Sequence, residues 1–205
     1  MLNLATIGPA LATAVALGLL AASVGLLRAP SAYLLSLHVV SRVVLDSAAA
    51  FTYEPAIGGL SLMQLYSVAF IGLSALHLLW QGRLRIHHYT LPLAAIVAAA
   101  ALSTVINRSY MELATLTLRW LYLWVLIALT LSALQQGAAR PVLAALAAGG
   151  IYAFLNIVYS VVTDQPKWGA GQWSYVGTYF HESDVSFLMI MLIVVVAGLS
   201  FLAQG

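Results

Sequence analysis

The sequence predicts an all-α fold, a polytopic transmembrane helix bundle with about seven spans and one longer external loop. Of its 205 residues, 63% are hydrophobic and 7% are charged. In a soluble domain, roughly 45–50% of the residues are hydrophobic and about 25% are charged. The mean hydropathy is +1.00. Apolar runs of about 20 residues, the length that crosses a bilayer, alternate with short connections. We therefore expect a single transmembrane domain over residues 1–205.

The seven expected spans are apolar stretches bounded by turn residues. They cover residues 4–27, 31–50, 61–80, 89–106, 111–134, 141–163 and 185–203. Every connection except 164–184 is short, so neighbouring spans should run antiparallel in one bundle. Small residues at 94–101 and 144–150 predict faces where helices pack closely.

The positions of arginine and lysine predict the orientation, because cytoplasmic loops are enriched in both. The first, third and fifth connections hold Arg28, Arg83, Arg85 and Arg140, whereas the others hold Arg108 and Lys167. Four basic residues against two place the first, third and fifth connections in the cytoplasm. The N-terminus and the 164–184 loop are then expected outside.

Charge and cysteine content exclude several classes of function. A formal net charge of +2, spread along the chain, provides no basic patch for nucleic acid. The absence of cysteine excludes disulfides, thiolate metal sites, iron–sulfur clusters and cysteine nucleophiles. We expect no nucleic-acid partner, no metal and no cofactor.

The second expected span carries polar residues on one face. His38, Arg42 and Asp46 are spaced at i, i+4 and i+8, so they form one stripe along a helix. Pairing Arg42 with Asp46 lowers the cost of placing both in a membrane. Two interpretations follow: a self-neutralised pair that only orients the span, or one part of a binding site.

Arg119 in the fifth expected span has no acidic residue three or four positions away. In the expected topology it lies as deep below the outer face as Arg42, about eight residues or roughly 12 Å. With Arg108 at the outer end, these arginines favour an anionic ligand, since Asp46 can neutralise only one of them. The alternative is that Arg119 snorkels to the membrane interface.

The 164–184 loop ends at the start of the last expected span, where Asp184 can cap the helix. His181 and Glu182 lie just before this point and could together accept a proton. A solvated loop histidine fits the local chemistry as well as a catalytic base does. The loop also holds aromatic residues suited either to sugar stacking or to the membrane interface, namely Trp168, Trp173, Tyr175 and Tyr179.

Three segments carry a family resemblance. Gly177-Thr178-Tyr179-Phe180-His181 runs directly into a hydrophobic span, Ser41-Arg42-Val43-Val44-Leu45-Asp46 precedes Gly59-Leu60-Ser61-Leu62, and the fifth span bears an arginine. Together they resemble the O-antigen ligase and O-antigen polymerase-like superfamily, bacterial inner-membrane enzymes that handle polyprenyl-diphosphate-linked glycans. Glu182 and Ser183-Asp184 depart from the proline and asparagine common there. Members of that superfamily continue with further spans, so we expect this chain to match the N-terminal half only.

The resemblance implies a glycosyltransferase-type ligase or polymerase acting at the outer face of the inner membrane, independent of metal. Arg42, Arg119 and Arg108 would contact the diphosphate. His181 with Glu182 would act as the base, and Asp46 and Asp184 would support the site. The implied partners are the lipid-linked glycan, membrane lipid, and a C-terminal half or partner subunit.

Two other functions fit the sequence. One is half of a lipid or solute transporter or flippase, which would need helices broken by glycine or proline in paired positions. The other is a haem b electron carrier with His38 and His77 as axial ligands, because both lie toward the cytoplasmic side of adjacent expected spans.

Overall fold

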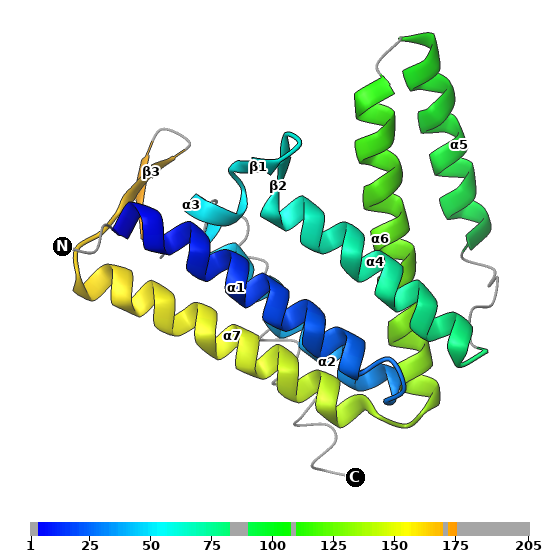
Figure 1. Ribbon diagram of the computed structural model, residues 1–205, viewed down its shortest axis with the longest axis horizontal. Helices are drawn as coiled ribbons and strands as arrows, with labels where there is room; N and C mark the ends of the chain where they lie inside the picture. Colours follow the sequence, from blue (N-terminus) through cyan, green and yellow to red (C-terminus); the bar gives the residue numbers. More distant parts are fainter. Residues whose placement is uncertain (1–3, 83–89, 108–109, 170–171, 176–205) are drawn as a thin grey trace.

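The computed structural model describes residues 4–82, 90–107, 110–169 and 172–175, and these residues are helical apart from two short hairpins (Figure 1). The helices are α1 (Leu4–Gly25), α2 (Ser31–Ser47), α3 (Ala49–Thr52), α4 (Leu62–Trp80), α5 (Thr90–Ile106), α6 (Tyr110–Gln135) and α7 (Ala139–Val162). The antiparallel hairpins pair β1 (Pro55–Ile57) with β2 (Leu60–Ser61), and β3 (Lys167–Gly169) with β4 (Gln172–Ser174). The prediction of an all-α fold is confirmed for this part of the chain.

Four of the described helices, α1, α4, α6 and α7, are long and apolar enough to cross a membrane. The apolar part of α5, Ala94–Ile106, is shorter, and α2 has 17 residues. Six of the seven expected spans coincide with a helix, whereas 185–203 lies outside the described residues. The structure therefore indicates a membrane protein with four candidate spans, and the number seven stays a prediction.

The second expected span is shorter than the sequence predicted, because the helix breaks at Ala48. There the backbone leaves helical geometry (φ −98°, ψ 30°) and the short helix α3 follows. The Thr52 hydroxyl donates a hydrogen bond to the Leu45 carbonyl at 3.0 Å, which satisfies one of the carbonyls left free at the end of α2. This turn brings Tyr53 back toward the last turn of α2.

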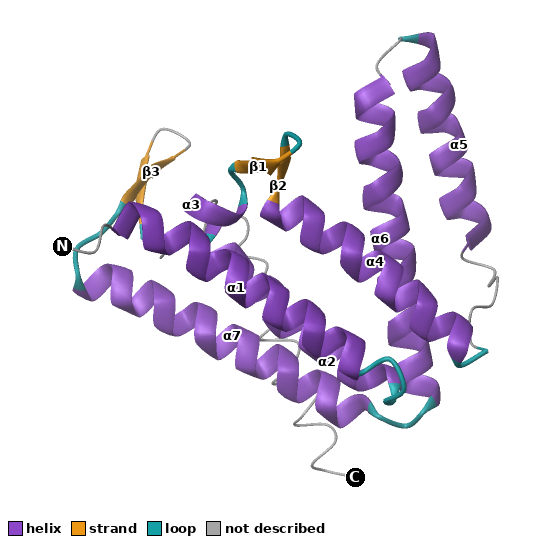
Figure 2. Ribbon diagram, viewed as in Figure 1, coloured by secondary structure: helices purple, strands orange, loops and turns teal. Residues whose placement is uncertain are grey.

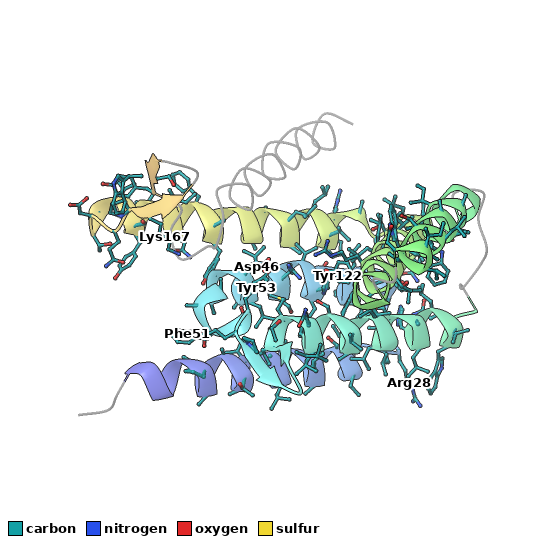
Figure 3. All side chains as sticks on the ribbon, turned by 90° about the horizontal axis from the view of Figure 1, so that it is seen from above. Arg28, Asp46, Phe51, Tyr53, Tyr122 and Lys167 are labelled. Atoms are coloured by element: carbon teal, nitrogen blue, oxygen red, sulfur yellow. The ribbon has the colours of Figure 1, made fainter. Side chains whose placement is uncertain are left out.

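Helix α2 lies at the centre of the bundle. Figure 3 shows it between α7 on one side and α1 and α4 on the other, and it also packs against α6. Leu34 and Leu45 of α2 belong to the same buried cluster as Phe70 of α4 and Leu129 of α6. The most polar helix of the bundle is thus the one that its neighbours surround.

Among the α6 residues whose side chains are described, those that pack into the bundle begin at Tyr122 and continue toward the C-terminal end. The buried residues of α6 fall between Val125 and Ala133, whereas Leu118, Leu121 and Leu123 are exposed. Figure 1 shows α5 and the N-terminal half of α6 leaning away from the other helices as a pair. Their exposed apolar side chains fit a lipid surrounding.

Small residues let α7 approach α2 closely. Ala145, Gly149, Gly150 and Ala153 form the buried face of α7, and a Cβ added at Gly149 would lie 3.2 Å from Cγ2 of Val43. The predicted packing face at 144–150 is therefore confirmed. Most residues of the similar stretch at 94–101 are exposed, although α5 packs against α6, so a close-packing face there stays a prediction.

A hydrogen-bonded group, here called the serine–histidine network, joins the ends of three helices. It consists of Ser31 of α2, His77 and Gln81 at the end of α4, and Ser132 and Gln136 at the end of α6. His77 Nδ1 donates to the Leu27 carbonyl at 2.8 Å, so its Nε2 accepts from the Ser31 hydroxyl at 3.0 Å. The network fixes α2 antiparallel to both α4 and α6, as the short connections predicted.

The close packing at Gly149 gives a stability prediction. We expect Gly149→Val to lower the free energy of unfolding by about 1–3 kcal/mol, because the added methyl groups collide with Val43 in a packed interface. The measurement is detergent-induced unfolding in mixed micelles. Gly72→Val is the matched control, since a Cβ at Gly72 of α4 meets nothing within 4 Å. Equal effects of the two substitutions would contradict the packing argument.

Candidate functional site

The candidate site begins with three side chains, here called the Arg42 triad. Arg42 and Asp46 belong to the last turns of α2, and Tyr53 follows α3. Arg42 Nε donates to Asp46 Oδ2 at 2.8 Å, which forms the ion pair that the i, i+4 spacing predicted. Arg42 Nη2 donates to the Tyr53 hydroxyl at 2.9 Å, and that hydroxyl donates to Asp46 Oδ1 at 2.7 Å. The three side chains close a ring of charge-assisted hydrogen bonds, which are stronger than neutral ones.

The triad leaves one edge of the Arg42 guanidinium open. A guanidinium has five N–H donors, and the bonds to Asp46 and Tyr53 use one on Nε and one on Nη2. The remaining three, two on Nη1 and one on Nη2, make no hydrogen bond with the described residues. The Arg42 side chain is 37% exposed. Its Nη1–Nη2 edge can therefore receive two oxygens of a phosphate in the bidentate geometry typical of arginine.

One turn below the triad, His38 joins α2 to α6. Its Nε2 forms a hydrogen bond with the Tyr122 hydroxyl, and the ring stacks on Phe70 of α4 with centroids 3.6 Å apart. The ring of Tyr66 lies parallel to it at 6.1 Å. His38 is only 3% exposed, and its Nδ1 has no partner among the described residues. His38 thus fixes where the Tyr122 hydroxyl lies below Arg42, and Figure 3 shows Asp46, Tyr53 and Tyr122 together between α7 and α4.

Arg119 lies outside this buried group. It precedes Tyr122 by three residues, so Arg119 and Arg42 are each about one helical turn from the His38–Tyr122 bond, toward the same end of the bundle. The two arginines therefore lie at similar levels along the bundle, while their depth in a membrane stays a prediction. The Arg119 side chain is, however, exposed and makes no hydrogen bond or ion pair with the described residues. The structure brings Arg42 and Asp46 together but does not bring Arg119 into contact with them.

The other expected site residues lie outside the described residues. These are Arg108, His181, Glu182 and Asp184. Among the described residues, no three histidine or acidic side chains are placed to hold a metal ion. The described part of the site therefore consists of an arginine paired with a carboxylate and a tyrosine hydroxyl.

The two histidines proposed as haem ligands have other roles in this structure. Both ring nitrogens of His77 take part in the serine–histidine network. His38 uses Nε2 for Tyr122, and Phe70 covers one face of its ring. Ligation of haem iron by His77 would require breaking one of its two buried hydrogen bonds, so the structure favours packing and bonding roles for both.

Sequence reasoning missed Tyr53 and Tyr122. Tyr53 lies seven residues after Asp46, beyond the break at Ala48, and no helical spacing links the two. Tyr122 lies in the same span as Arg119, but the sequence does not show which face of α6 meets α2. The available signal was the tyrosine itself, because a buried hydroxyl usually has a hydrogen-bond partner.

No protein-family model, curated protein or solved structure matches this chain.

The His38–Tyr122 bond gives a second prediction. His38→Leu and Tyr122→Phe should each destabilise the protein, because each leaves the other polar group buried and unpaired. The double variant should lose less unfolding free energy than the two single variants lose together, by about 0.5–3 kcal/mol. Detergent-induced unfolding of all four proteins measures this coupling.

The control pairs His38→Leu with Thr130→Val, because Thr130 is exposed and its hydroxyl donates within α6 to Leu126. The effects of these two substitutions on the free energy of unfolding should add to within about 0.5 kcal/mol. Additivity in the His38–Tyr122 pair as well would show that their bond contributes nothing.

Proposed function

We propose that this chain is a multi-pass protein of the bacterial inner membrane that binds a polyprenyl-diphosphate-linked saccharide, as a glycan ligase or polymerase of the O-antigen ligase type. The observation that carries the proposal is the open edge of Arg42. A guanidinium held by Asp46 and Tyr53, whose Nη1–Nη2 edge bonds to none of the described residues, suits a phosphate group. The resemblance of residues 41–46 and 177–181 to that superfamily supplies the substrate class.

The reaction we propose is glycosyl transfer. The oxygen of an acceptor hydroxyl bonds to the anomeric carbon of the lipid-linked sugar while the bond from that carbon to the phosphate oxygen breaks. The diphosphate leaves with the electron pair, and the acceptor proton passes to His181 or Glu182. Arg42, with Arg119 toward the same end, stabilises the charge that develops on the leaving diphosphate. Arg108, which lies outside the described residues, is proposed as a further contact.

The proposed orientation puts this site toward the outside, with seven spans and the 164–184 loop external. Successive long helices alternate in direction, so Arg28 and Arg140 both lie at the end of the bundle where α2 and α7 begin. This grouping supports the proposed orientation. The Arg42 triad lies near the opposite end. Cytoplasmic loops attract arginine, so the triad would face the outer leaflet.

A binding measurement tests the role of Arg42. We expect Arg42→Ala to weaken binding of a polyprenyl diphosphate by about tenfold or more, because charged hydrogen bonds contribute about 1.5–3 kcal/mol. Arg42→Lys should also weaken it, since an ammonium does not replace a planar fork. The measurement is titration of the purified protein in nanodiscs, with helical circular dichroism and elution volume checking that each variant folds.

Arg140→Ala is the matched control, because Arg140 is exposed in the first turn of α7 at the other end of the bundle. It should bind as the parent does. A folded Arg42→Ala or Arg42→Lys protein with unchanged affinity would overturn the proposal.

The orientation has its own test, which the absence of cysteine makes simple. We expect a cysteine at Gln165 to react with a membrane-impermeant maleimide added to intact cells. A cysteine at Gln135 should react only after the membrane is opened. Both glutamines are exposed, and they lie near opposite ends of α7, Gln135 in the last turn of α6 and Gln165 just after Val162. The reverse labelling pattern would show that the orientation is opposite to the one proposed.

A further inference from the structure

We propose that the two hairpins, with the residues beside them, form a collar that sits in the interfacial layer of one membrane leaflet. The collar comprises the exposed side chains of Phe51, Tyr53, Leu60, Tyr159, Trp173 and Tyr175. Its partner is the headgroup layer of a bilayer. This goes beyond the proposed function, because it assigns a lipid contact to surfaces outside the Arg42 triad and does not depend on which anion binds there.

The first support is the position of the hairpins. β1 and β2 lead into α4, and β3 follows α7 after four residues. Figure 2 shows both hairpins toward the end of the bundle opposite the α1–α2 and α6–α7 turns. The two ends of the bundle are thus built differently, with hairpins at one and tight turns at the other.

Charge is distributed as a membrane requires. The exposed charged side chains of the described residues lie mostly at the ends: Glu54, Asp164 and Lys167 near the hairpins, and Arg140 at the other end. Figure 3 shows Lys167 and Arg28 at opposite ends of the molecule. Between these ends the exposed side chains are mostly apolar, as at Val68 and Ile151; the polar ones include Arg119 and the threonines Thr13 and Thr130, whose hydroxyls bond within their own helices.

The spacing of the aromatic residues matches a bilayer. Trp80, 61% exposed, closes α4 with the Arg28 guanidinium carbon 5.1 Å from its ring centre, a pairing suited to an interface. The 19 residues of α4 span about 28 Å, close to the hydrocarbon thickness of about 30 Å. Leu60 therefore lies at the far hydrocarbon boundary when Trp80 lies at the near one.

The hairpin of β3 and β4 reaches farther out. The 24 residues of α7 span about 36 Å, which extends past the hydrocarbon into the headgroup region, since the whole bilayer measures about 40–45 Å. The Tyr175 hydroxyl donates to Asp164 Oδ1 at 2.7 Å and ties the end of the hairpin to the end of α7. The hairpin is held where its indole and phenol rings meet headgroups.

The surroundings of Trp173 favour lipid over saccharide. Trp173 is 67% exposed, and the neighbouring last turns of α7 expose Tyr159 and, at 78%, Val162. This apolar surface continues along α7 through Leu155. Amphipathic rings at the end of such a surface are typical of the membrane interface.

The collar also sets the depth of the candidate site. Tyr53 belongs to the collar and accepts a hydrogen bond from Arg42. Ser31 bonds to His77 near the Trp80 end of α4, and Arg42 lies about 16 Å farther along α2. The open edge of Arg42 therefore lies below the collar, on the hydrocarbon side of that boundary.

Spin labelling tests the collar in the intact chain, which has no native cysteine. Single cysteines replace Trp173, Leu60 and Val68, all exposed residues, and each spin-labelled protein is placed in phosphatidylcholine–phosphatidylglycerol vesicles. Collisions with oxygen, which prefers lipid, and with a water-soluble nickel chelate report the depth of each label. We expect Val68 in the hydrocarbon, Leu60 at its boundary and Trp173 in the headgroup layer.

Two results would overturn the proposal. In the first, the label at Trp173 has the collision ratio of free label in buffer. In the second, it becomes shielded from nickel only when a polyprenyl-diphosphate-linked saccharide is added, which would make the hairpin a saccharide subsite. Depth is measured here without ligand, so loss of diphosphate binding in the Arg42 variants would leave this result unchanged, and the two proposals fail separately.

Discussion

Helix α2 carries polar and charged side chains into the centre of a bundle whose other helices present apolar surfaces outward, so these groups need partners inside the protein. Most have one, whereas Ser36 Oγ and His38 Nδ1 have none among the described residues. Lipid offers no hydrogen bonds, and an unpaired buried polar group costs several kcal/mol. Helices α1, α4, α6 and α7 enclose α2, and α4 and α6 supply histidine, glutamine, serine and tyrosine side chains at matching levels. The arrangement of the bundle follows from this requirement.

The two ends of α2 meet the requirement in different ways. At its N-terminal end, the serine–histidine network is closed: Ser31, His77 and Ser132 are all buried and bonded to one another or to backbone. Such a network fixes the positions of the three helix ends. At the C-terminal end, the Arg42 triad satisfies Asp46 but leaves donors on Arg42, and that side chain is partly exposed. The N-terminal end of α2 therefore holds the bundle together, whereas its C-terminal end has donors that can bind a ligand.

The break at Ala48 connects the fold to the candidate site. A helix continuing to residue 50 would have carried the chain onward along the axis of α2. The break instead sends it through α3, whose Thr52 caps the carbonyl ends of α2, and returns Tyr53 beside Arg42. The following hairpin leads into the capping box of α4, where Ser61 accepts from the Gln64 backbone and Gln64 accepts from the Ser61 backbone. One irregular segment thus starts the next helix and completes the triad.

The sequence by itself determined the class of protein, the helical character, the approximate limits of six helices and the Arg42–Asp46 pair. These depend on composition and on spacing along one helix, where the backbone fixes which residues are neighbours. Only the tertiary structure decided that Tyr53 completes the triad, that Tyr122 bonds to His38, that His77 joins three helices and that Arg119 is exposed. Those facts depend on how each helix is rotated and where it crosses its neighbours. That geometry arises from the packing of all the helices together, as the buried small residues 145–153 of α7 and the exposed ones at 94–101 of α5 illustrate.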